Sequence, residues 1–160
     1  MSGKADFSVD EWDLLRCSPL MASMMVVAAS PSGPVGLVQE SGAAARTIIQ
    51  SVGTAQTPLL KALAEDVTQT MAIPKPPPGA TPGQVQEAAA EILRRMSALL
   101  TTKATPEEAN EIKVWLAKVA QATAEAAKEG GFLGFGGASV SDQEKAALAT
   151  LNTALGLGTA

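Results

Sequence analysis

Histidine and tyrosine are absent from this sequence of 160 residues, and aromatic residues make up only 3% of it. Without histidine the chain has no E-x-x-H di-iron pair, no H-E-x-x-H zinc site and no imidazole base for a serine or cysteine nucleophile. The usual tools of hydrolytic and metal-dependent catalysis are therefore missing. We expect a protein that is not an enzyme and that holds no cofactor and no metal.

Cysteine occurs once, as Cys17, which excludes an internal disulfide and fits a reducing compartment. The first residues lack the basic flank and apolar core of a secretory signal. The longest apolar stretch, Leu20 to Ala29, is shorter than the ~20 residues that span a bilayer, and Ser23 interrupts it. We expect a soluble, cytoplasmic protein without a transmembrane helix.

An excess of positive charge is also missing, because 12 Lys and Arg residues stand against 16 Asp and Glu residues. The net charge is −4, and no basic stripe is visible along the chain. Since binding to phosphate backbones depends on such a stripe, we do not expect nucleic acid as a partner.

Helix-forming residues dominate what is present, because alanine is abundant and the aromatic residues that favour sheets are scarce. The sequence predicts an all-α fold, a single domain over residues 1–160 built as a bundle of about six helices. The proline-rich tract IPKPPPGA, residues 73–80, would be a stiff connector between N-terminal helices in 1–72 and C-terminal helices in 81–160. Alternatively, this tract could bind a groove that recognises proline.

Four capping boxes mark predicted helix starts, because each places Glu or Gln three residues after a Ser or Thr. Proline follows two of these caps at the first helical position, where a missing N–H costs nothing. The capping pairs are Ser8 with Glu11, Thr81 with Gln84, Thr105 with Glu108, and Ser141 with Glu144. With the apolar periodicity they predict helices over 9–17, 20–29, 35–52, 58–71, 82–100, 106–129 and 142–155, a break or kink at Ser18-Pro19 and a turn at 31–34.

The loop at 130–137, GGFLGFGG, is the most unusual stretch, with two of the three phenylalanines among five glycines. It is not a dinucleotide fingerprint, because Ser139 stands where the third glycine belongs, and it lacks the lysine of a phosphate-binding loop. The apolar residues could pack back over the end of the bundle. They could instead form a partner anchor or a shallow membrane wedge, and we assign the partner-binding role to Phe132, Leu133, Gly134 and Phe135.

Sulfur-containing residues cluster at helical spacing, with Cys17, Met21 and Met24 at i, i+4 and i+7 and Met25 adjacent. Such a stripe could hold a soft ion such as Cu(I), but methionine and free cysteine are ordinary core residues. We expect core packing. An alternative function remains open, in which Met21, Met24, Met25 and Met96 line an apolar cavity for a small molecule.

Charged residues are nearly missing from Ser18 to Leu60, where only Glu40 and Arg46 occur. Such a stretch is either packed tightly inside the bundle or forms a homo-oligomer seam or an apolar groove. The opposite pattern occurs at Glu87 and Glu91 and at Glu107, Glu108 and Glu111, where carboxylates are one turn apart. We expect these carboxylates to form ordinary surface pairs with Arg94, Arg95 and Lys113 rather than a cation site or an acid and base pair.

The C-terminal quarter, from Trp115 to Gly156, resembles the ending of a family of small, uncharacterised bacterial helical proteins. The resemblance lies in AEAAKEGGFLGFGG, residues 124–137, and in VSDQEKAAL, residues 140–148. It implies no activity. The second segment also distantly resembles the last helices of tellurite-resistance-type helical domains, whose acidic cluster has no counterpart here.

These observations favour a non-enzymatic interaction or scaffold protein that self-associates or docks to a larger assembly. The expected interface is the 18–60 surface or the 130–137 loop. The alternative is a carrier or sensor that holds an apolar small molecule between helices. We also expect Phe7, Trp12, Trp115, Phe132 and Phe135 to share one aromatic cluster.

Overall fold

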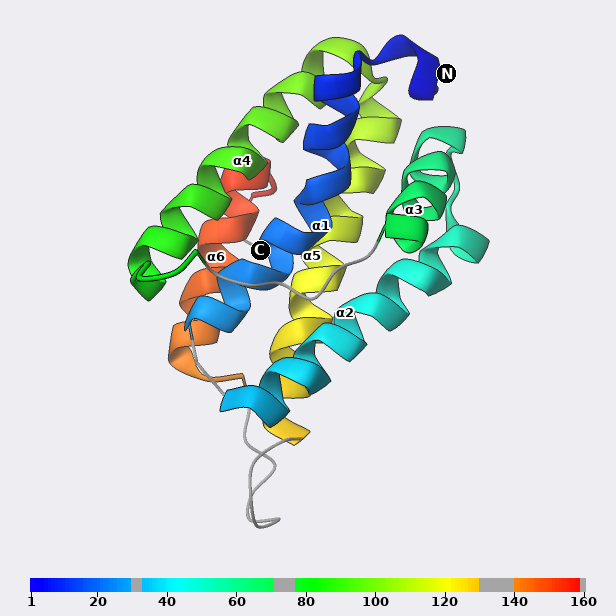
Figure 1. Ribbon diagram of the computed structural model, residues 1–160. Coiled ribbons are helices and arrows are strands. Elements are labelled where there is room, and N and C mark those ends of the chain that lie inside the picture. Colours follow the sequence, from blue (N-terminus) through cyan, green and yellow to red (C-terminus); the bar gives the residue numbers. More distant parts are fainter. Residues whose placement is uncertain (30–32, 71–76, 130–139, 159–160) are drawn as a thin grey trace.

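The computed structural model of the protein describes residues 1–29, 33–70, 77–129 and 140–158. Within these ranges the chain forms helices and no strand, which confirms the predicted all-α bundle (Figure 1). A short 3-10 helix, η1 (Lys4–Asp6), precedes the α-helices. These are α1 (Val9–Ala29), α2 (Gly33–Thr54), α3 (Pro58–Thr70), α4 (Pro82–Lys103), α5 (Pro106–Glu129) and α6 (Asp142–Leu155).

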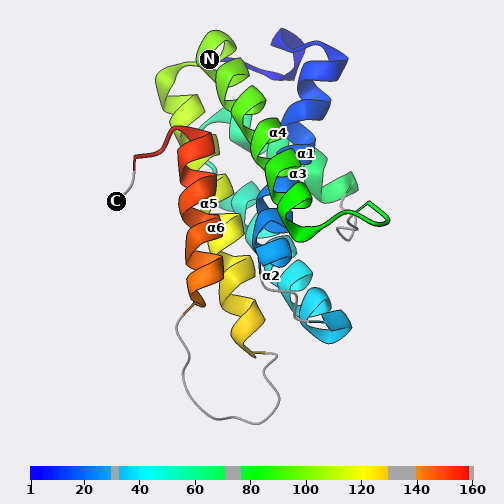
Figure 2. The same ribbon diagram turned by 90° about the vertical axis from the view of Figure 1, so that its left-hand side faces the viewer.

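Helices α1 and α5 form the centre of the bundle, because each packs against all the other α-helices of the described chain. Helices α4 and α6 pack against each other on one side of this central pair, and α2 and α3 pack together on the other side (Figures 1 and 2). The outer faces of α2 and α3 are therefore separated from those of α4 and α6 by the full width of the bundle.

The four predicted capping boxes are all present, and they explain where α1, α4, α5 and α6 begin. At α4 the Gln84 amide donates to Thr81 Oγ1 over 3.3 Å, and the Thr81 amide donates to Gln84 Oε1 over 2.9 Å. The same exchange joins Ser8 to Glu11, Thr105 to Glu108 and Ser141 to Glu144. Each pair satisfies two amides that the helix itself leaves without a partner.

Of the predicted break or kink at Ser18-Pro19, the break is wrong, because α1 continues through Pro19 as one helix of 21 residues, while the kink stays a prediction. Proline removes one backbone hydrogen bond from a helix interior, which normally interrupts it. Here both Ser18 and Pro19 are buried, and Ser18 Oγ donates to the Leu14 carbonyl over 2.7 Å. Tertiary packing of the apolar sides of α1 therefore outweighs the local cost.

Two of the predicted connections lie partly outside the described residues. Residues 31 and 32 of the predicted turn lie outside the described residues. Residues 33 and 34 belong instead to α2, which begins at Gly33, two residues before the predicted start. Residues 73–76 of the proline-rich connector also lie outside them, while 77–80 form a turn in which Gly79 has a φ of 78°. At the other end α6 closes at Gly156, whose φ of 69° is the left-handed conformation usual for a helix C-cap.

One continuous apolar core joins the central helices to both flanking pairs. Phe7 and Trp12 contact each other within it, with ring centroids 5.9 Å apart, and Trp115 is buried in the same core. Phe132 and Phe135 of the expected aromatic cluster lie outside the described residues. The fully buried large side chains include Leu15, Met25, Leu63, Leu93, Met96, Leu100, Ile112, Leu116 and Leu151.

Polar contacts fasten the N-terminal segment to the turn between α4 and α5. The Ser2 amide donates to Glu108 Oε1 over 2.7 Å, and Ser2 Oγ donates to the Lys103 carbonyl over 2.9 Å. Burial raises the pKa of the Glu108 carboxyl, but the hydrogen bonds from Thr105 and Ser2 outweigh it and hold this pKa below its usual value. The chain start is thereby tied to residues a hundred positions away.

Candidate functional site

The residues predicted to anchor a partner, Phe132, Leu133, Gly134 and Phe135, lie outside the described residues. Their assignment stays a prediction.

The four methionines predicted to line a ligand cavity are divided between two parts of the interior. Met25 and Met96 are fully buried in the main core, while Met24 packs with Ala28 and Val85 in a smaller cluster. Met21 is partly buried and packs against both. Their role as core residues accounts for these positions, and their role in ligand binding stays a prediction.

The carboxylates one turn apart serve two different structural purposes. Arg94 pairs with Glu91 over 2.8 Å and with Glu87 over 3.2 Å, which is the surface pairing we expect. Glu111 instead reaches the turn between α2 and α3, where it accepts hydrogen bonds from the Gln56 amide over 2.5 Å and the Thr57 amide over 3.0 Å. Glu111 thus fastens the start of α3 to α5.

No group of three or more acidic or cysteine side chains that could hold a metal occurs among the described residues. Cys17 is half-buried, and its Sγ donates to the Leu14 carbonyl over 3.2 Å. Burial raises the pKa of the Cys17 thiol, so at neutral pH it is protonated and a poor nucleophile or metal ligand.

The charge-poor stretch from Ser18 to Leu60 divides into two structurally different parts. Its first part, the second half of α1, is packed inside the bundle, where Ser23 Oγ lies 3.2 Å from Thr123 Oγ1 of α5. Internal packing explains the lack of charge there. The second part is α2, which lies at the edge of the bundle and has a solvent-facing side.

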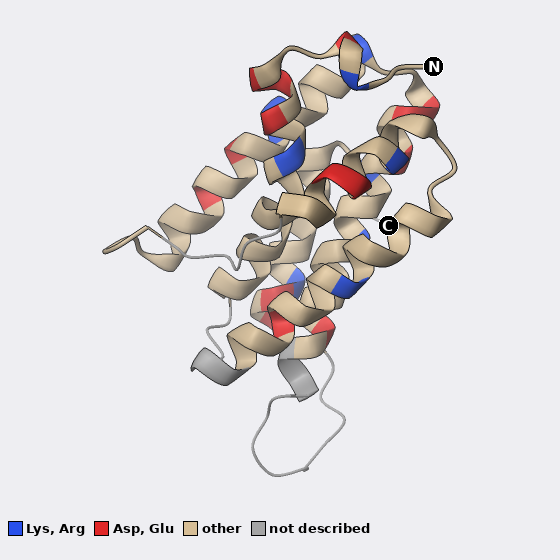
Figure 3. Ribbon diagram, turned by 45° about the vertical axis from the view of Figure 1, so that its right-hand side comes forward, with Lys and Arg blue, Asp and Glu red and all other residues tan. Residues whose placement is uncertain are grey.

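One strip of the solvent-facing side of α2 is apolar, and the exposed polar residues Arg46 and Gln50 lie beside it. Val38 and Ile49 keep 64% and 51% of their surface exposed, and the half-buried Gly42 and Ala45 lie between them on the same side. In Figure 3 most of the α2 ribbon is tan, since Glu40 and Arg46 are its only charged residues. We call Val38, Gly42, Ala45 and Ile49 the α2 stripe.

Burial on the opposite side confirms which way α2 is turned. Ala43, Ala44 and Ile48 are at most 7% exposed, and Glu40 is 1% exposed. The α2 stripe therefore points away from the core. No α-helix in the described ranges, α2 included, is both long and apolar enough to cross a bilayer.

Gly42 has no packing role inside the described bundle. A Cβ added to it would meet no described atom within 4 Å outside the backbone of its own helix. Glycine in a helix interior costs about 1 kcal/mol relative to alanine. Internal packing of the described residues therefore does not explain why the α2 stripe carries glycine at this position.

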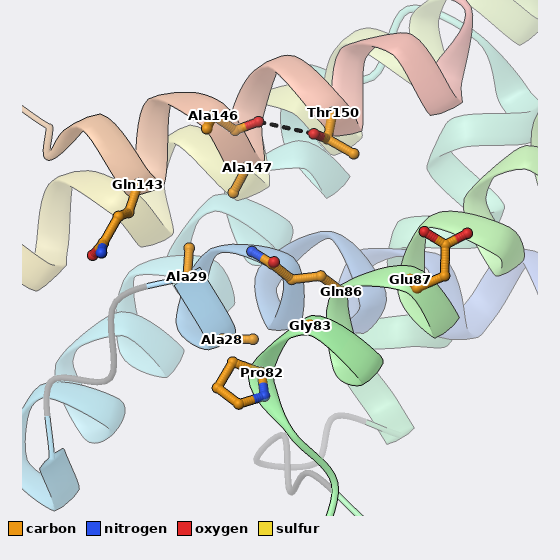
Figure 4. A pocket seen from close by; sticks show the side chains of 10 residues that line it. All are labelled: Ala28, Ala29, Pro82, Gly83, Gln86, Glu87, Gln143, Ala146, Ala147 and Thr150. Atoms are coloured by element: carbon orange, nitrogen blue, oxygen red, sulfur yellow. Dashed lines mark hydrogen bonds between the residues drawn. The ribbon is translucent and has the colours of Figure 1, made fainter.

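A pocket of about 400 Å³ opens between α1, α4 and α6 (Figure 4). Ala28 and Ala29 at the end of α1, Gly83 at the start of α4 and Ala147 on α6 supply small walls. Gln86 also lines it, and its Nε2 donates to the Met25 carbonyl over 3.2 Å. Its volume suits a small ligand, but none of the four methionines lines it.

The sequence contains the spacing of the α2 stripe, but it shows neither that this side of α2 faces solvent nor where the pocket lies. Residues separated by four, three and four positions lie on one side of a helix, and this spacing is visible from Val38 to Ile49. The pocket combines short segments of three helices that are far apart in the chain. No local pattern brings such segments together.

Comparison of this chain with protein-family models, curated proteins and solved structures found no match. The resemblance of residues 124–137 and 140–148 to a bacterial family therefore stays a prediction.

Proposed function

We propose that this chain is a non-enzymatic interaction or scaffold protein that self-associates, or docks to a larger assembly, through apolar surfaces. The observation that carries the proposal is the exposure of Val38 and Ile49 on the charge-poor outer face of α2. Single exposed apolar residues are common on protein surfaces, but two of them joined by small residues along one strip of a helix support an interaction site. The 130–137 loop, with Phe132 and Phe135, is the second surface that we propose.

The experiment is light scattering of the purified protein over a range of concentrations, repeated for the double variant Val38→Glu, Ile49→Glu. We expect an average mass above that of the monomer, and we expect the double variant to return it to the monomer because two buried charges are costly at an interface. Val9→Glu is the matched control, since Val9 is 78% exposed and lies at the start of α1. A wild type that stays monomeric at every concentration would contradict self-association.

The loop is tested separately by Phe132→Ser with Phe135→Ser. If the loop is an interface, this pair lowers the average mass and leaves the helical circular dichroism signal unchanged. If the phenylalanines are core residues, the pair lowers the free energy of unfolding of a protein whose mass is unaffected.

The pocket offers a site for a second candidate function, the carrier or sensor of an apolar small molecule, although Gln86, Glu87, Gln143 and Thr150 make part of its lining polar. A Cβ added to Gly83 would meet no described atom within 4 Å beyond the nearby α4 backbone, so Gly83→Phe should fill the pocket while the bundle stays folded. The neutral fluorophore N-phenyl-1-naphthylamine is a suitable probe. For this second function, the fluorescence of the probe rises with wild type and stays low with Gly83→Phe, whereas equal signals from both proteins argue against the pocket.

A further inference from the structure

The α2 stripe has the same spacing in both directions along the helix. Val38, Gly42, Ala45 and Ile49 are separated by four, three and four residues, and their sizes follow the order large, small, small, large. A second α2 helix running antiparallel would place Val38 opposite Ile49 of the other copy and Gly42 opposite Ala45 of the other copy. The stripe is therefore complementary to itself, as a two-fold interface requires.

We infer that the partner of the α2 stripe is a second copy of this chain, packed antiparallel about a two-fold axis between Gly42 and Ala45. This inference rests on the proposed function, because it needs the outer face of α2 to be an interface. The large exposed side chains, Val38 and Ile49, contact each other at both ends of the seam. The small residues at its centre let the two helix backbones approach.

Gly42 is compatible with close approach at the centre of the seam. Within the described bundle the space beside its Cα is open, so no internal contact requires glycine. Glycine is placed in helices where another backbone must come near. A second α2 helix crossing at this point is such a backbone.

Charge around the α2 stripe is compatible with a second copy. No acidic residue lies on the stripe, and Arg46 is the single exposed charge of α2. The two-fold axis separates the two Arg46 positions by five residues, or about 7.5 Å along the helix, where salt screens part of their repulsion. Association should therefore become tighter as salt concentration rises, whereas docking to an acidic partner would weaken.

The size of the seam sets the expected affinity. An α2 helix of 22 residues is roughly 33 Å long, so a helix face about 10 Å wide covers less than half of the ~800 Å² per partner of a stable interface. We expect a weak dimer with a dissociation constant in the micromolar range or above. The measurements must extend to several hundred micromolar protein.

Cysteine cross-linking tests the register directly. In the full chain with Cys17→Ser, which keeps a donor for the Leu14 carbonyl, Val38→Cys and Ile49→Cys are prepared as two separate proteins. The mixture should form disulfide dimers at least fivefold faster than either protein alone, because position 38 faces position 49 of the other copy. Two copies of position 38 are 11 residues apart, about 16 Å along the axis, which is too far for a disulfide.

Val9→Cys in the same background is the control for collisional cross-linking, since Val9 is more exposed than either stripe residue. Efficient dimers of Val38→Cys alone would show parallel packing and overturn the inference. A wild-type dimer that Val38→Glu dissociates, but that never cross-links above the Val9→Cys level, would overturn the register and leave the proposed function standing. A monomer at all concentrations and salt levels would overturn both.

Discussion

The indole Nε1 of Trp12 donates a hydrogen bond of 2.5 Å to Oδ2 of Asp66, which joins the start of α1 to α3. Lys4 donates to the same carboxylate oxygen over 2.8 Å, and its ammonium group also lies 5.5 Å from the centre of the Trp12 ring. One carboxylate therefore holds the N-terminal segment, α1 and α3 together. The hydrogen bond from Lys4, followed by that from Trp12, lowers the pKa of Asp66 below 3.8.

Stability should depend on pH through Asp66. Because its folded pKa lies below its unfolded value, the contribution of Asp66 is complete above about pH 5 and is lost as pH falls below 3.8 through the folded pKa. We expect Asp66→Asn to lower the free energy of unfolding by about 1–2 kcal/mol at pH 7, and by progressively less as pH falls below 3.8. Thermal unfolding of both proteins across this range measures the difference.

Glu65→Gln is the control for Asp66→Asn, because the neighbouring Glu65 is exposed and its side chain makes no hydrogen bond or ion pair with the described residues. Its effect should be small at every pH. A difference between wild type and Asp66→Asn that does not shrink as pH falls below 3.8 would contradict the role of the ionised carboxylate.

Glu111 should matter more for stability than its position among surface carboxylates suggests. It accepts hydrogen bonds from two backbone amides at the start of α3, so Glu111→Gln should cost about 1–3 kcal/mol in urea unfolding. Glu107→Gln, four residues earlier on the exposed side of α5, should change it by no more than ~0.5 kcal/mol. Equal effects of the two substitutions would show that the hydrogen bonds from Gln56 and Thr57 to Glu111 do not contribute to the free energy of unfolding.

The cap of α6 provides a local test. Ser141 Oγ accepts from the Glu144 amide over 3.2 Å, so Ser141→Ala should cost about 1 kcal/mol of unfolding free energy. Ser141→Asp keeps a cap acceptor and should remain within a few tenths of a kcal/mol of wild type. The comparison is made by urea unfolding at neutral pH, and a loss with both variants would point to packing of the Ser141 side chain instead.

Two glycine-to-alanine substitutions should have opposite effects in dilute solution. Gly42→Ala should raise the free energy of unfolding by up to about 1 kcal/mol, because alanine favours the helix and meets open space. Gly156→Ala should lower it by about 1 kcal/mol, because the φ of 69° is unfavourable for a side chain. Destabilisation by Gly42→Ala under these conditions would mean that this position is packed within the monomer.

Local signals predicted the helices well because helix boundaries depend on neighbouring residues. Thr81-Pro82 and Thr105-Pro106 start α4 and α5 at the predicted residues, and α6 spans the predicted residues 142–155. Pro19 shows the limit of this reasoning. Its local preference predicts a break, but its surroundings come from distant helices and keep α1 intact.

The candidate site was predicted only as a range, because the sequence does not say which side of α2 is covered. That choice depends on packing against α5, more than fifty residues later in the chain. Glu111 illustrates the same point, since its partners at Gln56 and Thr57 are distant in sequence. Only the assembled bundle distinguishes the buried side of α2 from the exposed one.

The helices that pack together most extensively, α1 with α4 and α2 with α5, are separated by long stretches of chain. Loops of this length must close before the core can form, so folding should be slower than in bundles whose neighbours in sequence are neighbours in space. On the ribosome α1 and α2 emerge long before α4 and α5. Until then the sides of α1 and α2 that face α4 and α5 are exposed, and transiently exposed apolar surface of this kind promotes aggregation.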